Sequence, residues 1–161
     1  MINKVTSYLD KIGVRYELLR HEAVVTTEES AKIIHVDGCM SCKSLYVKDK
    51  KSDNFYMVVL PASKRADMRG LASYVGTTKF EFATEDKLFN DLHVHRGSVS
   101  PFAFLNEDPN KSAPLLIDVD VWSATKVKFH PCDNTATVVL SGSDLQLFLE
   151  SIKKRVIVVG D

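Results

Sequence analysis

Lys43-Ser44-Leu45-Tyr46-Val47, followed by Phe55-Tyr56-Met57-Val58-Val59-Leu60, decides the fold of this 161-residue chain. Both runs are rich in β-branched and aromatic residues, which favour strands. The segment between them, residues 48–54, is polar and charged. Two β-forming runs around a short polar segment predict a β-hairpin.

Further elements are predicted on both sides of this hairpin. Apolar residues recur at helical spacing from Val5 to Ile12, and Gly13 follows as a stop, so residues 3–12 are predicted to be helical. Thr26 and Glu29 have the spacing of a capping box, which predicts a helix to about Ile34. The other predictions are a strand at 16–19, a helix capped by Asp67 and closed by Gly76, a strand at 80–82, a helix capped by Thr84, strands at 102–105, 115–119, 126–129 and 135–140, a helix capped by Ser143, and a last strand or tail at 156–159.

The composition favours one globular domain. Hydrophobic residues make up 45% of the chain and charged residues 26%, and neither a repeat nor a linker divides it. Because strands and helices alternate irregularly, we expect a single α+β domain with one mixed sheet. The chain has no run of eighteen apolar residues and no signal-peptide layout at its start, so we expect a cytoplasmic protein without a membrane partner.

The charge balance bears on nucleic-acid binding. Twenty-one basic residues balance twenty-one acidic ones, which argues against a general binder of DNA or RNA. A local patch could still contact the end of a tRNA. The candidate patches, which a charged turn and a solvated helix face would also explain, are Lys48, Lys50 and Lys51, then Lys64, Arg65 and Arg69.

Gly97-Ser98-Val99-Ser100-Pro101 has the pattern of a shaped loop. Gly97 permits a backbone conformation or a close approach that a side chain forbids, and Pro101 restricts its own φ and the conformation of Ser100. The N–H groups of Ser98, Val99 and Ser100 could then point at a carbonyl or carboxylate. A purely structural turn would show the same pattern. Neither serine has the Gly-x-Ser-x-Gly setting of a hydrolase nucleophile.

Four stretches in this order carry a resemblance to a known family: His21-Glu22-Ala23-Val24-Val25-Thr26, Cys42-Lys43-Ser44-Leu45-Tyr46-Val47, the Gly97 loop, and Phe129-His130-Pro131-Cys132-Asp133-Asn134-Thr135-Ala136-Thr137. They resemble the YbaK and prolyl-tRNA-synthetase editing-domain superfamily, and the last stretch looks most like the PrdX or ProXp-ala type of alanyl-tRNA(Pro) deacylases. The resemblance implies one deacylase domain over residues 1–161 with a mixed barrel-like β-sheet flanked by helices. It implies hydrolysis of a mischarged small amino acid from tRNA, most naturally Ala-tRNA(Pro), and alternatively Cys-tRNA(Pro) or another mischarged tRNA.

The resemblance also assigns roles to residues. Lys43, which is otherwise an ordinary strand-end lysine, would hold the terminal phosphate or the ester carbonyl. The family often has asparagine after this lysine, whereas this chain has Ser44. His130 would orient a water or shape the pocket, unless it makes only a structural hydrogen bond. The substrate's own ribose hydroxyl would help to activate the water.

Other positions are implied as pocket lining. Gly97 and Pro101 would shape the loop, Ser98, Val99 and Ser100 would line the pocket, and Asn134 would brace its neighbourhood. His21 and Thr26 would pack near the same pocket, although helix capping alone explains Thr26. The expected partners are the acceptor end of tRNA(Pro) and, transiently, prolyl-tRNA synthetase. No metal or organic cofactor is implied.

Two alternatives remain at this point. Cys39 and Cys42 form a Cys-x-x-Cys pair, and with His130 and Cys132 they could supply four ligands to a structural zinc. The second alternative is a non-catalytic module that binds tRNA or a synthetase. Its support is Ser44, which stands where the family often has asparagine. His93 and His95 would share one face of a strand but lack further ligands.

Overall fold

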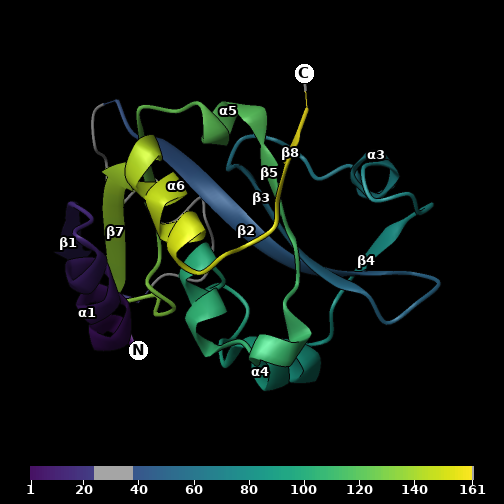
Figure 1. Ribbon diagram of the computed structural model, residues 1–161, viewed down its shortest axis with the longest axis horizontal. Coiled ribbons are helices and arrows are strands. Elements are labelled where there is room, and N and C mark those ends of the chain that lie inside the picture. Colours follow the sequence, from purple (N-terminus) through teal and green to yellow (C-terminus); the bar gives the residue numbers. More distant parts are fainter. Residues whose placement is uncertain (24–37, 161) are drawn as a thin grey trace.

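β2 (Met40–Asp49) is the longest strand in the described part of the chain and crosses the middle of the molecule (Figure 1). The structure is a computed structural model in which residues 1–23 and 38–160 are described. β2 pairs antiparallel with β3 (Phe55–Pro61), with Lys43 opposite Leu60. The hairpin is confirmed, and its first strand begins at Met40 rather than at Lys43.

The described strands form one eight-stranded mixed sheet. Its order is β1-β7-β6-β2-β3-β5-β8, and β4 pairs with β2 off this path. The pairs β2–β6, β3–β5 and β5–β8 are parallel, and the other pairs are antiparallel. The mixed sheet with its helices confirms the predicted α+β class. The remaining strands are β1 (Tyr16–Arg20), β4 (Phe80–Phe82), β5 (Leu115–Asp118), β6 (Lys126–Phe129), β7 (Ala136–Ser141) and β8 (Val156–Val159).

The sheet curves around its main apolar core. Buried residues of β6 and β7 share this core with buried residues of β3 and β5, although these strands lie in different halves of the sheet. Tyr8 of α1 and Phe148 of α6 pack edge to face over it, with ring centroids 5.8 Å apart. The helices of the described residues are α1 (Ile2–Ile12), α3 (Met68–Ser73), α4 (Glu85–Leu92), α5 (Val119–Trp122) and α6 (Gly142–Ser151), with 3-10 turns η1 (Pro101–Asn106) and η2 (Pro109–Lys111).

Most local predictions are confirmed by the hydrogen bonds that define the elements. The carboxylate of Asp67 accepts from the Gly70 N–H at 3.0 Å, and the hydroxyl of Thr84 accepts from the Lys87 N–H at 3.1 Å. α3 is shorter than expected and ends at Ser73, before the Gly76 stop. Residues 156–159 are a strand, β8. The helix predicted from Thr26 to Ile34 lies outside the described residues.

Two predictions are wrong, each for a physical reason. Residues 102–105, predicted as a strand, belong to the 3-10 turn η1. Pro101 occupies its first turn, and a short, continuously apolar run does not reveal its period. The cap of α6 is Ser141, whose hydroxyl accepts from the Asp144 N–H at 3.0 Å. Ser143 was the wrong serine because the helix begins directly after β7, at Gly142, where a Cβ would overlap the Ala124 carbonyl oxygen.

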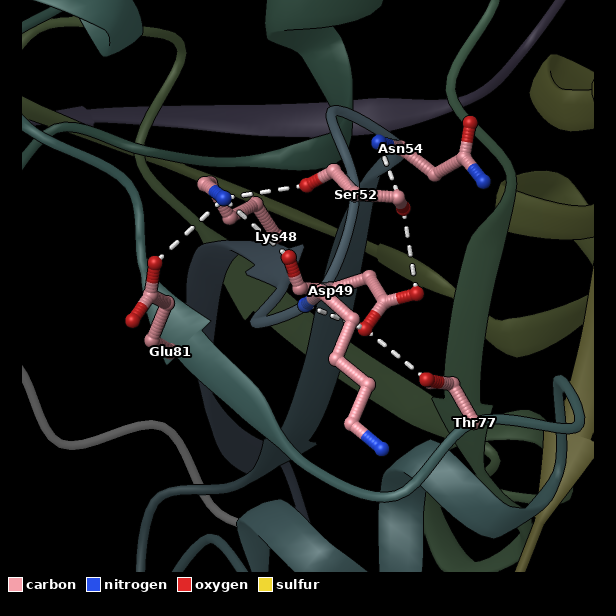
Figure 2. A network of polar contacts seen from close by, with 7 residues as sticks. Lys48, Asp49, Ser52, Asn54, Thr77 and Glu81 are labelled. Carbon is pink, nitrogen blue, oxygen red and sulfur yellow. Dashed lines mark hydrogen bonds and ion pairs between the residues drawn. The ribbon is translucent and has the colours of Figure 1, made fainter.

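A polar network closes the β2–β3 turn and joins it to β4 (Figure 2). The Asp49 carboxylate accepts hydrogen bonds from the Lys51 N–H at 3.0 Å, the Ser52 hydroxyl at 3.0 Å and the Thr77 hydroxyl at 2.8 Å. The Lys51 N–H, then the two hydroxyls, lower the pKa of Asp49. Lys48 Nζ donates to the Ser52 carbonyl at 2.9 Å and lies 3.4 Å from Glu81. Lys48 is therefore part of the turn's own structure.

The second candidate basic patch is likewise partly neutralised within the chain. Lys64 Nζ lies 3.0 Å from the Asp118 carboxylate and 2.8 Å from that of Asp120. Arg65 and Arg69 are exposed.

Among the helices of residues 1–23 and 38–160, none combines the length and the apolar character needed to cross a bilayer.

Candidate active site

The candidate site lies at a gap along one edge of β2. At the start of this strand Met40 and Ser41 pair with β6, and at its end Val47–Asp49 pair with β4. Between them, residues 42–45 have no strand partner on this edge within the described segments. A cavity of about 400 Å³ occupies the gap. The split between β6 and β4 therefore opens the sheet over the middle of its longest strand.

The cavity brings together residues from three of the four sequence stretches that carry the resemblance. Lys43 and Ser44 come from β2, Gly97 and Val99 from the shaped loop, and His130 from the end of β6. These residues are up to 87 positions apart in the chain, from 43 to 130. The structure thus makes one site of motifs that the sequence shows only in order.

Only some of the residues of the Gly97 loop that were predicted to line the pocket do so. Gly97 has a φ of 94°, in the region that favours glycine, as expected. The Ser98 N–H donates to the His95 carbonyl at 3.0 Å, so it is used within the turn. Ser100 is fully buried and Pro101 is buried at the start of η1, and neither lines the cavity. Gly97 and Val99 thus form this part of the wall, and Ser98, Ser100 and Pro101 do not line the cavity.

The ring of His130 is oriented by the backbone. Nδ1 lies 2.9 Å from the Ala136 carbonyl, which can only accept, so Nδ1 carries a proton. In the neutral ring Nε2 is then an acceptor. Burial lowers the pKa of His130, and the hydrogen bond to Ala136 opposes this shift. The geometry and the lowered pKa favour a neutral imidazole at physiological pH, with Nε2 able to accept a hydrogen bond.

His21 stands behind His130. Its Nε2 lies 2.9 Å from the hydroxyl of Thr137, which lines the cavity, and its Nδ1 lies 2.7 Å from the Glu22 carbonyl. Because Nδ1 must donate to that carbonyl, the neutral ring accepts from Thr137. The His21 and His130 rings are 6.1 Å apart. His21 therefore supports the wall of the cavity through Thr137.

Ser44 has an unusual environment. Its hydroxyl oxygen is buried in the cavity wall and has no hydrogen-bond partner within the described residues. Buried polar atoms normally have a partner, because leaving one without costs about 1–3 kcal/mol. Ser44, directly after Lys43 on β2, therefore carries an unsatisfied hydroxyl in the wall of the cavity.

The cavity is cationic. Its described lining includes Lys43, Arg96 and Lys128, and no aspartate or glutamate belongs to that lining. The side chain of Arg96 is 76% exposed, whereas Lys128 is only 6% exposed. Such a cavity attracts an anionic ligand, or a ligand on which negative charge develops.

Arg96, Thr137 and Lys128 were missed by the sequence analysis. Arg96 precedes the Gly97 loop, and Thr137 ends the quoted Asn134 motif, but neither position alone indicates that it faces a cavity. For Lys128 a signal existed: Lys128 is only two residues before His130, near the end of a predicted strand.

A family model described as the aminoacyl-tRNA editing domain matches residues 21–148. The chain belongs to this family. Two relatives with similar coverage agree. The chain is 35% identical to the prolyl-tRNA editing protein ProX of Acetoanaerobium sticklandii, over 91% of this chain and 89% of that protein. It is 30% identical to prolyl-tRNA synthetase associated domain-containing protein 1 of Mus musculus, over 89% and 86%.

Solved structures show the same editing-domain fold. The hypothetical protein APE2540 superposes with a TM-score of 0.76 at 24% identity, covering 95% of this chain and 96% of that one. A crystal structure of a proposed trans-editing enzyme for prolyl tRNA synthetase gives 0.75 at 18% identity, covering 99% and 96%. As a member of the aminoacyl-tRNA editing family, the chain is an aminoacyl-tRNA deacylase, and the predicted family and enzyme class are confirmed.

The four candidate zinc ligands do not assemble in this editing domain. In residues 1–23 and 38–160, no three histidine, cysteine or acidic side chains gather as a metal site would require. Cys132 is buried with its sulfur 3.8 Å from the Ser100 hydroxyl, and Cys42 lines the cavity. Burial raises the pKa of Cys42 and of Cys132 to about 12, which keeps both thiols protonated. The zinc alternative is therefore wrong for Cys39, Cys42, His130 and Cys132.

Two further residues predicted to bind substrate, Asn134 and Thr26, are not found in the described lining of the cavity. Asn134 is in the turn between β6 and β7 and does not line the cavity. In the same turn Asp133 accepts from the N–H and the hydroxyl of Thr135 at 2.8 and 2.6 Å. Thr26 lies outside the described residues.

Proposed function

We propose that this deacylase acts in trans on a mischarged small amino acid esterified to the terminal ribose of tRNA, with Ala-tRNA(Pro) as its main substrate. The observation that carries the proposal is the cationic cavity at the β2 gap, where Lys43, Ser44 and His130 meet the Gly97 loop. The relatedness to the prolyl-tRNA editing protein ProX supports tRNA(Pro) as the carrier. The editing domain spans residues 1–161, works in the cytoplasm, and meets prolyl-tRNA synthetase transiently.

The reaction is ester hydrolysis. A water oxygen attacks the ester carbonyl carbon, and the carbonyl π electrons move onto the carbonyl oxygen. When this tetrahedral intermediate collapses, the bond to the ribose oxygen breaks and that oxygen takes up a proton. The free amino acid and a tRNA with an intact ribose leave. The protein must therefore position a water and stabilise transient negative charge.

The proposed roles follow from the cavity wall. His130, held by the Ala136 carbonyl, offers Nε2 to the attacking water. Lys43 binds the phosphate of the terminal nucleotide from its partly exposed position on β2. Ser44 donates its unsatisfied hydroxyl to the substrate. The vicinal ribose hydroxyl assists the water.

The loop is proposed to select the amino acid by exclusion. Val99 lines the cavity, and the backbone behind it is fixed by the buried Pro101 and by η1. Attraction distinguishes one methylene by only about 1–3 kcal/mol, whereas a rigid wall rejects a larger side chain outright. A short, stiff loop suits a small substrate such as alanine.

The test compares release of the amino acid from Ala-tRNA(Pro), Cys-tRNA(Pro) and Pro-tRNA(Pro) by the purified protein, with and without a metal chelator. We expect rapid, chelator-insensitive release of alanine and sparing of the prolyl ester. Preference for the cysteinyl ester would contradict the alanine assignment and leave the editing reaction standing. Release from none of the three would refute the proposed substrate class.

Lys43→Ala tests the site itself. We expect it to lose most turnover while its unfolding midpoint stays close to that of the parent, because Lys43 is partly exposed. Lys50→Ala is the matched control, since Lys50 is exposed in the β2–β3 turn and does not line the cavity. Unchanged hydrolysis by the Lys43 variant would place the reaction elsewhere.

A further inference from the structure

Lys128 is a buried lysine on the wall of the proposed active site. It lies on β6, opposite Ser41 of β2 and Val139 of β7 in the strand register. Only 6% of the residue is exposed, and it lines the same cavity as Lys43 and His130. Lysine is almost never this buried unless it is paired, and Lys128 does interact with another group of the chain.

Lys128 is close to His130 in the chain. Lys128 is the last residue but one of β6, His130 directly follows that strand, and both line the cavity. Burial lowers the pKa of His130 most, and the positive charges of His21 and Lys128 lower it further. Burial lowers the pKa of Lys128 itself. Lys128 and His130 thus line one cavity, and burial acts on the pKa of both.

The two lysines of the cavity differ in exposure, and this difference suggests different tasks. A phosphodiester keeps its charge and much of its hydration, so it suits the partly exposed Lys43 and the exposed Arg96. A charge that exists only during the reaction is best stabilised by a desolvated, preorganised cation, because charges interact more strongly where water is excluded. Lys128 meets that description.

Building on the proposed function, we propose that Lys128 is a second catalytic cation of the deacylase, which stabilises the negative charge on the ester carbonyl oxygen. During attack the water oxygen forms a bond to the carbonyl carbon and the π electrons pass to the carbonyl oxygen. Lys128 stabilises that oxyanion until the electrons return and expel the ribose oxygen. The ammonium keeps its proton throughout, so the balance of the step is that of ester hydrolysis.

The kinetic test uses Lys128→Met, Lys128→Arg and the control Lys126→Met. Lys126 is on the same strand but does not line the cavity. In single-turnover assays with Ala-tRNA(Pro), we expect Lys128→Met to slow the chemical step about 100-fold with half-saturation unchanged within about twofold. Lys128→Arg, which keeps the charge, should retain a larger part of the rate, and Lys126→Met all of it. A parent-like rate for Lys128→Met, or a change confined to half-saturation, would overturn the proposal.

A second readout does not depend on turnover. The groups that act on His130 are His21, Asp133, Lys128 and the Ala136 carbonyl. Because Lys128 disfavours the protonated imidazole, Lys128→Met should raise the pKa of His130 in an NMR titration, and Lys126→Met should not. The acidic limb of the rate profile should move to higher pH in parallel. An unmoved or lowered His130 pKa would refute a shared cavity.

The two readouts keep the two proposals distinguishable. If the parent protein released no amino acid, the proposed function would fail, while the His130 titration would still decide whether Lys128 acts within the cavity. If the parent were active and Lys128→Met equally active, only the role of Lys128 would be refuted. Met matches the apolar stem of lysine, so a large loss of thermal stability in Lys128→Met, with Lys128→Arg also inactive, would indicate a structural role and overturn the proposal.

Discussion

Replacing Ser44 with alanine should raise stability and lower activity together. In the described part of the chain the Ser44 hydroxyl oxygen is buried without a hydrogen-bond partner. Leaving such a group unsatisfied costs about 1–3 kcal/mol, and alanine removes that cost while keeping the β-carbon. We therefore expect the free energy of unfolding to rise by about 1 kcal/mol or more. For a domain of this size that corresponds to about 2–4 °C in Tm per kcal/mol.

The effect on catalysis has the opposite sign, because the proposed partner of this hydroxyl is the substrate. A hydrogen bond contributes about 0.5–1.5 kcal/mol net, so its loss should lower kcat/KM about 2- to 13-fold. The assays are thermal unfolding followed by circular dichroism and release of alanine from Ala-tRNA(Pro).

Thr137→Val provides the matched control for Ser44→Ala. Thr137 is 1% exposed and its hydroxyl already has a partner, the His21 Nε2 at 2.9 Å. Its replacement should lower the Tm, since it leaves a ring nitrogen of His21 without that partner. If Ser44→Ala lost stability as Thr137→Val does, or kept full activity, the assignment of Ser44 as an unsatisfied substrate donor would be refuted.

Two further predictions concern the scaffold. Lys154 and Glu107 form an ion pair of 2.8 Å, and their side chains are only 2% and 7% exposed. Glu107→Ala should therefore lower the free energy of unfolding, measured in urea, by about 3–5 kcal/mol. A loss below about 1 kcal/mol would contradict a buried pair. The pKa of Asp49 is lowered in the folded protein. Ionised Asp49 therefore stabilises the fold at pH values above its ordinary pKa of about 4, and this stabilisation is lost as the pH falls through the lowered pKa. Asp49→Asn should therefore flatten the dependence of Tm on pH below about pH 4, and an unchanged slope would show that the network in Figure 2 does not act on stability.

Much of the secondary structure could be predicted because its causes are local. The caps at Asp67 and Thr84 each need only a side chain and an N–H three residues later. The strands of the β2–β3 hairpin are runs of β-forming residues around a polar turn. Prediction failed for residues 102–105, because a short, continuously apolar run has no visible period.

The candidate site was predictable only where a motif marked it. Lys43 and His130 stand in motifs and line the cavity, whereas Ser100 and Pro101 stand in a motif and do not line it. Lys128 stands in no motif. Its burial depends on β7, the next strand in the chain, and on β2, which pairs with the other side of β6 from a distant part of the chain.

Local sequence was enough to predict the observed strands, most helix ends, the conformation of Gly97 and the family, because each of these depends on residues close together or on motifs in a set order. The position of the site, in contrast, follows from the tertiary structure. Along one edge, β2 pairs first with β6 and then with β4, and the residues between these two pairings line a cavity. Both pairings are long-range, and they leave no trace in local propensity or spacing. The charge of the cavity likewise arises when Lys43, Arg96 and Lys128 converge from three separate segments.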